Sequence, residues 1–215
     1  VAGFFWLLPR LAEEGTATTL GHVRLDGGRE ILNGPGTPIL TGLSLSQDGR
    51  TLAFPGQSPE HPAEVFLQGS NDKSPRRLTN SNPWLADLRL ARQEVMTWKA
   101  RDGLSLEGIL TYPLNYEPGR RYPLILYVHG GPEAHVSHGW ITSYSSPGQV
   151  AAARGFAVFC PNYRGSTGRG VEFSKLGQAD AAGREFDDLV DAVDHLVAAG
   201  IADKAKVGIT GGSYG

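Results

Sequence analysis

The sequence is short of the features that mark several large classes of protein. Its 215 residues include a single cysteine, so no disulfide can form within the chain, and this usage is typical of a reducing compartment. Cys160 lies in the apolar run FAVFC, which predicts a buried and unreactive thiol. From cysteine usage alone we expect a cytoplasmic protein.

Long apolar runs and dense runs of basic residues are also missing. No stretch is long enough to cross a bilayer, and the opening VAGFFWLLP lacks the basic flank of a signal peptide, so we interpret it as a strand. The net charge of −2 gives no electrostatic footprint for nucleic acid. We therefore expect neither a membrane nor a nucleic acid as partner.

Residues 1–89 contain short apolar stretches separated by glycine, asparagine, aspartate and proline, which predicts antiparallel strands. The clearest is LSLSQDGRTLAF, in which Asp48-Gly49 would form the tight turn of a hairpin. Strands at this spacing are typical of a propeller or a sandwich, with room for about two propeller blades. Because a closed propeller needs more blades, we expect further sequence upstream.

Beyond residue 90 the pattern changes to strands that alternate with helices. The predicted strands are 94–99, 105–112, 123–128, 156–160 and 206–210, and the predicted helices are 146–154 and 184–199. The alternation predicts a mostly parallel sheet with both faces covered. In helix 184–199 we expect one face to be apolar and the other to be solvated. The apolar residues are Phe186, Leu189, Val190, Val193, Leu196 and Val197, and the solvated ones are Asp187, Asp188, Asp191, Asp194 and His195.

The segment GGSYG, residues 211–215, directly follows predicted strand 206–210 and matches the G-x-S-x-G pattern of a nucleophile elbow. Such a turn holds its serine, here Ser213, in a strained conformation with Oγ exposed, and small residues on either side let the backbone pass closely. The backbone N–H of Tyr214 would then point at a developing oxyanion.

The segment HGGP, residues 129–132, directly follows predicted strand 123–128. In hydrolases of this kind the equivalent loop supplies a second oxyanion donor, for which we select the N–H of Gly131. Taken alone, each segment could be a plain glycine turn. Their joint occurrence, with alternating strands and helices between them, favours a hydrolase.

The segment NYRGSTGRG, residues 162–170, lacks the Lys-Ser/Thr of a phosphate loop, and we interpret it as a rigid loop that lines the pocket. Arg164 would brace this loop by pairing with Asp187 or Asp188. His129 and Arg164 are also candidates for substrate binding. His135 and His138 have the spacing of a metal pair but no further ligand of fitting spacing, so we expect no metal and no cofactor.

Taken together, HGGP, NYRGSTGRG, Asp187-Asp188-Leu189 and GGSYG resemble the prolyl oligopeptidase family of serine peptidases, and most closely its acylaminoacyl-peptidase-like branch. The resemblance covers residues 90–215 well and residues 1–89 weakly. It implies that residues 1–89 are the C-terminal part of a β-propeller and that residues 90–215 are the N-terminal part of an α/β-hydrolase domain.

The resemblance also implies an activity, the cleavage of short peptides through a Ser-Asp-His triad. Ser213 would be the nucleophile, and the N–H groups of Tyr214 and Gly131 would form the oxyanion hole. His129 stands where some relatives use a tyrosine hydroxyl as a donor, so this chain would rely on backbone donors.

The order Ser, Asp, His along such chains places both triad partners after Gly215. We therefore expect a fragment that is inactive and poorly soluble alone, with strand 206–210 exposed. Three alternatives stay open: an esterase or lipase on the same fold, an inactive pseudoenzyme, and a propeller-based binding module. Homo-oligomerisation is open as well.

Overall fold

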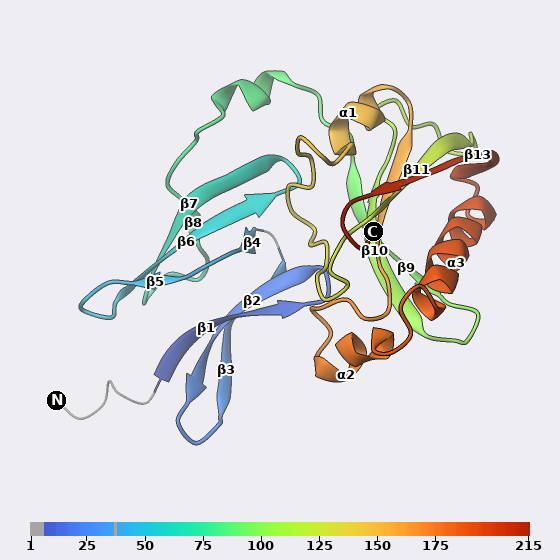
Figure 1. The fold of residues 1–215 in the computed structure, drawn as a ribbon. Helices are drawn as coiled ribbons and strands as arrows, with labels where there is room; N and C mark the ends of the chain where they lie inside the picture. Colours follow the sequence, from blue (N-terminus) through green and yellow to red (C-terminus); the bar gives the residue numbers. More distant parts are fainter. Residues whose placement is uncertain (1–6, 37) are drawn as a thin grey trace.

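A computed structural model describes residues 7–36 and 38–215, and its strands form three β-sheets (Figure 1). The first sheet is an antiparallel meander of three strands. These strands are β1 (Leu7–Glu14), β2 (Ala17–Arg24) and β3 (Arg29–Gly36). Most of the strand expected at the opening VAGFFWLLP lies outside the described residues.

The second sheet is also antiparallel. Its strands are β4 (Ile39–Leu40), β5 (Ser44–Leu45), β6 (Thr51–Ser58), β7 (His61–Gly69) and β8 (Arg76–Arg77). The hairpin expected at Asp48-Gly49 is confirmed: β5 pairs with β6, and the N–H of Ser46 donates to the carbonyl of Thr51 at 2.9 Å. Gly49 has φ 71°, the left-handed conformation that such a turn requires.

The third sheet has the strand order β13-β11-β12-β10-β9. It follows the short 3-10 helix η1 (Pro83–Asp87), and its strands are β9 (Gln93–Lys99), β10 (Ser105–Thr111), β11 (Tyr122–Val128), β12 (Ala157–Asn162) and β13 (Ala202–Gly211). Strand β11 is parallel to both of its neighbours, whereas the β9-β10 and β10-β12 pairs are antiparallel. All five strands expected from the sequence are confirmed, with bounds that differ by a few residues.

Both expected helices are also present, as α1 (Gly148–Ala153) and α3 (Arg184–Ala198). Two short elements between them, α2 (Val171–Ser174) and the 3-10 helix η2 (Lys175–Gly177), were not predicted. They follow the glycine-rich loop 162–170 and are too short to carry a helical pattern of apolar residues.

Both faces of the third sheet are covered, as the apolar strands predict. On β12, Phe159 packs in the cluster that includes Leu196 of α3, whereas Val158 and Cys160 pack against Ala151 of α1. Helix α3 lies on the side of the sheet away from β1–β8 (Figure 1). Burial raises the pKa of the Cys160 thiol to about 12, which confirms the expectation of an unreactive cysteine.

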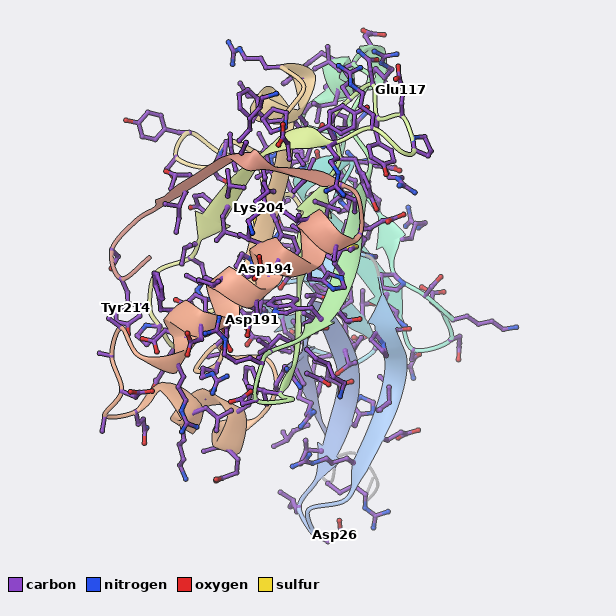
Figure 2. The ribbon with its side chains drawn as sticks, turned by 90° about the vertical axis from the view of Figure 1, so that its right-hand side faces the viewer. Asp26, Glu117, Asp191, Asp194, Lys204 and Tyr214 are labelled. Carbon is purple, nitrogen blue, oxygen red and sulfur yellow. The ribbon has the colours of Figure 1, made fainter. Side chains whose placement is uncertain are left out.

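The exposed and buried faces of α3 differ from the prediction at apolar and at polar residues. Phe186 and Val190, expected in the core, are 60% and 36% exposed, whereas Asp188, expected in solvent, is fully buried. Asp187, Asp191 and His195, also expected in solvent, are half-buried. The buried residues are Glu185, Asp188, Leu189, Ala192 and Leu196. Their spacing is helical, so the helix turns two acids toward the protein in place of the two apolar side chains. Asp191 and Asp194 lie on the face of α3 that Figure 2 views directly.

Strand β13 is an edge strand of the third sheet, and residues 204–211 are exposed. The expectation that strand 206–210 is exposed is therefore confirmed. Among the described residues, no helix combines the length and the apolar character needed to span a bilayer.

Candidate active site

Ser213 occupies a sharp turn directly after β13. Its φ is 60°, in the left-handed region that residues with a side chain rarely adopt, and the turn is closed by a hydrogen bond of 3.0 Å from the N–H of Gly215 to the carbonyl of Gly212. The whole segment 211–215 is exposed. The serine thus has the strained backbone and the exposure that the elbow pattern predicts.

The glycines at both ends of this turn are required by close backbone approach. A Cβ on Gly211 would lie 2.6 Å from the carbonyl oxygen of Val128, and one on Gly215 would lie 2.7 Å from that of His129. Contacts this short do not occur for real Cβ atoms, so only glycine lets the turn pack against the end of β11. This confirms the reason given for small residues in the GGSYG segment.

The HGGP segment lies directly beside the elbow. A Cβ on Gly130 would be 2.9 Å from Cβ of Ser213 and 2.8 Å from the carbonyl oxygen of Gly212. Gly131 has φ 130°, a conformation that strains any residue with a side chain. Among the described residues, neither the N–H of Gly131 nor that of Tyr214 has a hydrogen-bond acceptor. Two N–H groups without acceptors thus occur on the two segments that meet at Ser213.

His129 is buried and its ring is held on several sides. Nδ1 lies 2.9 Å from the carbonyl oxygen of Gly130, and Nε2 lies 3.0 Å from Oγ of Ser166. The ring stacks on Tyr163 with 4.4 Å between centroids, and the hydroxyl of Tyr163 donates to the backbone carbonyl of His129 at 2.7 Å. Burial lowers the pKa of His129, which favours the neutral ring.

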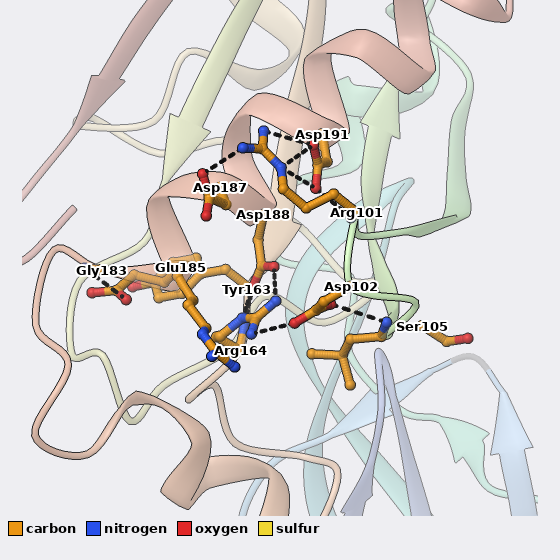
Figure 3. A network of polar contacts seen from close by, with 12 residues as sticks. Arg101, Asp102, Ser105, Tyr163, Arg164, Gly183, Glu185, Asp187, Asp188 and Asp191 are labelled. Atoms are coloured by element: carbon orange, nitrogen blue, oxygen red, sulfur yellow. Dashed lines mark hydrogen bonds and ion pairs between the residues drawn. The ribbon is translucent and has the colours of Figure 1, made fainter.

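Arg164 forms a buried ion pair with α3 (Figure 3). Its Nε and Nη2 donate to the carboxylate of Asp188 at 2.9 and 2.7 Å, and its Nη1 donates to Asp102 at 2.8 Å. The expected bracing contact is therefore made, and Asp188 is the partner. Asp187, the other acid considered, pairs instead with Arg101 at 2.8 Å.

The same contacts bear on the substrate-binding roles expected for His129 and Arg164. Both ring nitrogens of His129 and all three nitrogens of the Arg164 guanidinium contact acceptors or hydroxyls within the protein. Each residue is less than 10% exposed. Their side chains therefore hold neighbouring segments of the protein in this structure.

Sequence reasoning missed a second anchor, which joins the elbow to α3. The hydroxyl of Tyr214 donates to the buried carboxylate of Glu185 and accepts from the N–H of Ala182 at 3.1 Å. Glu185 also accepts from the N–H groups of Ala182 at 2.5 Å and Gly183 at 3.2 Å. The hydrogen bond to Glu185 raises the pKa of Tyr214. A glutamate in the first turn of a helix is ordinarily attributed to the helix dipole, so the sequence gives no signal for this role.

The remaining histidines contact other partners. His135 contacts the hydroxyls of Thr167 and Ser137 at 2.8 and 2.9 Å, and His138 lies 3.3 Å from the carbonyl oxygen of Gln93. Within residues 7–36 and 38–215, which include all six histidines, no imidazole is hydrogen-bonded to Ser213.

The fold and the site define a class of protein. A mixed sheet covered on both faces, with a strained and exposed serine directly after a parallel strand, is the arrangement of the α/β-hydrolase fold. The model of the prolyl oligopeptidase family matches residues 142–215. The chain belongs to the prolyl oligopeptidase family.

Relatives and solved structures agree with this assignment. The chain is 34% identical over 187 residues to the uncharacterized peptidase YuxL of Bacillus subtilis, and 34% identical over 188 residues to dipeptidyl aminopeptidase BIII of Pseudoxanthomonas mexicana. These alignments cover 82% and 85% of this chain, and 26% of each relative. The chain thus spans about a quarter of the length of these curated relatives.

Two solved structures superpose on nearly the whole chain. Acylaminoacyl peptidase of Pyrococcus horikoshii gives a TM-score of 0.80 at 24% identity and covers 96% of this chain and 32% of its own. A putative dipeptidyl aminopeptidase IV from Bacteroides ovatus gives a TM-score of 0.80 at 26% identity, with 97% and 30% covered. The likeness extends over β1–β8 as well as the third sheet, so the N-terminal strands belong to the same fold.

Proposed function

We propose that the natural polypeptide carrying this sequence is a serine peptidase that cleaves short peptides by acyl transfer through Ser213. The observation that carries the proposal is the elbow itself: an exposed serine at φ 60° with the backbone of Gly130 packed against it. The relatives named as dipeptidyl and acylaminoacyl peptidases support peptides as the substrate class.

The chemistry follows from the positions of the groups. Oγ of Ser213 attacks the scissile carbonyl carbon, and the carbonyl oxygen becomes an oxyanion that the N–H groups of Gly131 and Tyr214 bind. The C–N bond then breaks, the amine leaves with a proton, and an acyl-serine remains. Water attacks this ester and releases the acid, which restores Ser213.

A serine hydroxyl is a weak nucleophile at neutral pH, so the mechanism needs a general base. The histidines of the described residues are not hydrogen-bonded to Ser213, and we assign the base to an imidazole outside these residues, oriented by a carboxylate. For this reason the experiments below use the complete natural polypeptide.

The proposal is tested by turnover of two substrates, an aminoacyl-nitroanilide and a p-nitrophenyl ester. We expect cleavage of the anilide, and we expect Ser213→Ala to lower its kcat by about 10⁴-fold or more, as for other catalytic serines. Ester cleavage without anilide cleavage would indicate an esterase on the same fold. No turnover of either substrate would favour an inactive member of the family and would contradict the proposal.

A further inference from the structure

A polar pocket lies beside the HGGP segment, and the acyl-transfer steps described above do not use it. Its volume is 390 Å³, which falls within the range of about 300–1,000 Å³ that is typical of ligand pockets. It is lined by Glu133, by three residues of the glycine-rich loop 162–170 and by four residues between Val171 and Gln178. The pocket therefore lies between the loop that follows HGGP and the short elements α2 and η2.

One wall of the pocket continues directly into the HGGP segment. Glu133 is three residues after Gly130, which packs against Ser213. The backbone of Glu133 therefore lies within about 11 Å of that of Gly130, because an extended chain spans at most ~3.6 Å per residue. A peptide whose scissile carbonyl lies at Ser213 covers the same distance in about three to four residues.

The opposite wall leads to the other side of the site. Gln178 is four residues before Ala182, and the N–H of Ala182 donates to the hydroxyl of Tyr214 at 3.1 Å. The pocket thus adjoins both of the segments that flank Ser213, and a bound peptide can extend into it.

Backbone hydrogen bonds form the pocket before any substrate binds. The N–H of Thr167 donates to the carbonyl of Ala134 at 2.9 Å, which fixes the loop after HGGP against loop 162–170. On the other side, Oγ of Ser174 donates to the carbonyl of Ser166 at 3.0 Å, and the N–H of Ser174 donates to that of Gly170 at 3.2 Å. A pocket with fixed walls binds a substrate group at a low cost in ordering.

The unpaired charge of the pocket is that of Glu133. Its side chain is exposed, and within residues 7–36 and 38–215 its carboxylate has neither a hydrogen bond nor an ion pair. The base that lines the same pocket, Lys175, binds Glu172 at 3.1 Å. Most exposed glutamates are simply solvated. Glu133 differs because it lines a preformed pocket two residues after a proposed oxyanion donor.

We propose that Glu133 is a specificity-determining residue, whose carboxylate binds a lysine or arginine side chain of the peptide substrate within about four residues of the scissile bond. The inference rests on the proposed function and names a substrate preference for the same site. A long basic side chain fits the pocket because Val171 and the glycines of the wall offer apolar surface to its aliphatic stem. Because Glu133 is exposed, the ion pair changes kcat/KM by at most about fivefold.

The test uses internally quenched peptides and the complete natural polypeptide. Two peptides are identical except at one position, which carries lysine in one and norleucine, an uncharged analogue of similar length, in the other. This position is moved along the peptide on both sides of the scissile bond, and mass spectrometry identifies the bond that is cleaved. All peptides share the same amino terminus, so the ratio of kcat/KM for lysine to that for norleucine reports the side chain alone.

We expect the wild type to prefer lysine by about three- to fivefold at one position, and we expect Glu133→Gln to bring this ratio to about one. Lys175→Gln should raise the ratio, because it removes a like charge from the same pocket. A higher salt concentration should lower the ratio in the wild type, because salt screens exposed charges.

Glu117→Gln is the matched control, since Glu117 is also an exposed glutamate but lies far from Tyr214 (Figure 2). We expect it to keep the wild-type ratio. A ratio near one at every position in the wild type, or a preference that survives Glu133→Gln, would overturn the inference and leave the proposed function intact. Equal losses on both peptides in Glu133→Gln would also overturn it, because Glu133 would then not distinguish the side chains. A wild type that cleaves no peptide would refute the proposed function, and this inference with it.

Discussion

The two proposed oxyanion donors are supported in contrasting ways. The N–H of Gly131 belongs to a segment that follows a central strand, β11, and is held by the buried side chains of His129 and Tyr163. The N–H of Tyr214 belongs to the segment that follows β13, and this segment is tied to α3 by the hydroxyl of Tyr214 itself. One half of the site is supported by burial, and the other by the two hydrogen bonds of the Tyr214 hydroxyl in addition to its packing against β11.

Both supports nevertheless end on the same helix. Asp188 holds the loop that carries Tyr163 (Figure 3). Glu185, one turn earlier on α3, holds Tyr214. Both acids are at least 95% buried. The inner face of α3 thus presents two carboxylates to the site, one for each side of Ser213. The comparison teaches that polar residues on this face serve to fix backbone segments that carry the proposed donors.

The largest effect is expected from breaking the buried ion pair. Arg164→Ala would leave Asp188 fully buried and without its main partner, which costs about 3–5 kcal/mol of folding free energy. We expect urea denaturation to show this loss, with a smaller change in the relative rates on different substrates.

Arg101→Ala is the matched control for that measurement. Arg101 binds Asp187 and Asp191 on the same helix, but its side chain is 53% exposed, so we expect a much smaller loss of stability than for Arg164→Ala. Equal losses of stability for Arg164→Ala and Arg101→Ala would show that the burial of an ion pair on α3 does not determine how much it contributes to stability. A changed substrate profile with unchanged stability in Arg164→Ala would contradict the bracing role.

An intermediate effect is expected at the half of the site that carries Tyr214. Tyr214→Phe keeps the backbone N–H and removes the hydroxyl that binds Glu185, so the elbow loses its side-chain tie to α3. We expect a small loss of stability and a kcat reduced by about three- to tenfold. Tyr127→Phe, which removes a tyrosine hydroxyl that makes no hydrogen bond within the described residues, serves as the control. A kcat for Tyr214→Phe equal to that of the control would show that the hydrogen bond between Tyr214 and Glu185 does not affect catalysis.

The smallest effect is expected at Asp102, the partly exposed partner of Arg164. The hydrogen bond from Arg164 lowers the pKa of Asp102 from its ordinary value of 3.8. A carboxyl whose folded pKa is depressed contributes stability that is present above the unfolded pKa and is lost as the pH falls through the folded pKa. Asp102→Asn should therefore be less stable than the wild type by under about 1 kcal/mol at neutral pH.

Measuring the stability of Asp102→Asn as a function of pH isolates the contribution of Asp102, the more exposed of the two carboxylates that Arg164 binds. The stability difference between the variant and the wild type should shrink as the pH falls below about 4. Acid-dependent urea denaturation of both proteins measures it. A difference that grows toward acid would mean that the pKa of Asp102 is raised, which contradicts the contact with Arg164.

Much of the third sheet could be predicted because its strands are continuous apolar runs, as in β12, and because each is bounded by turn residues. The elbow could be predicted because the turn that follows β13 needs glycine on both sides of Ser213, and that requirement is visible in the sequence as GGSYG. The division of the chain near residue 89 stays a prediction.

The polar anchors could not be predicted from the pattern of α3. Periodicity counts apolar residues as buried, and it cannot know that Asp188 has an arginine opposite it in the fold. Phe186 was assigned to the core for the same reason and is exposed. The sequence also could not show that the ring of His129 is held within the protein. Its two contacts are with the carbonyl of Gly130 and with the hydroxyl of Ser166, and the second lies 37 residues away.

The measurement that tests the central claim most directly is mass-spectrometric mapping of a fluorophosphonate adduct on the complete natural polypeptide. If Ser213 is the nucleophile held between the two supported backbone segments, the adduct maps to Ser213 alone, and denaturing the protein before labelling abolishes it. An adduct on another serine, or a folded protein without any adduct, would contradict the account.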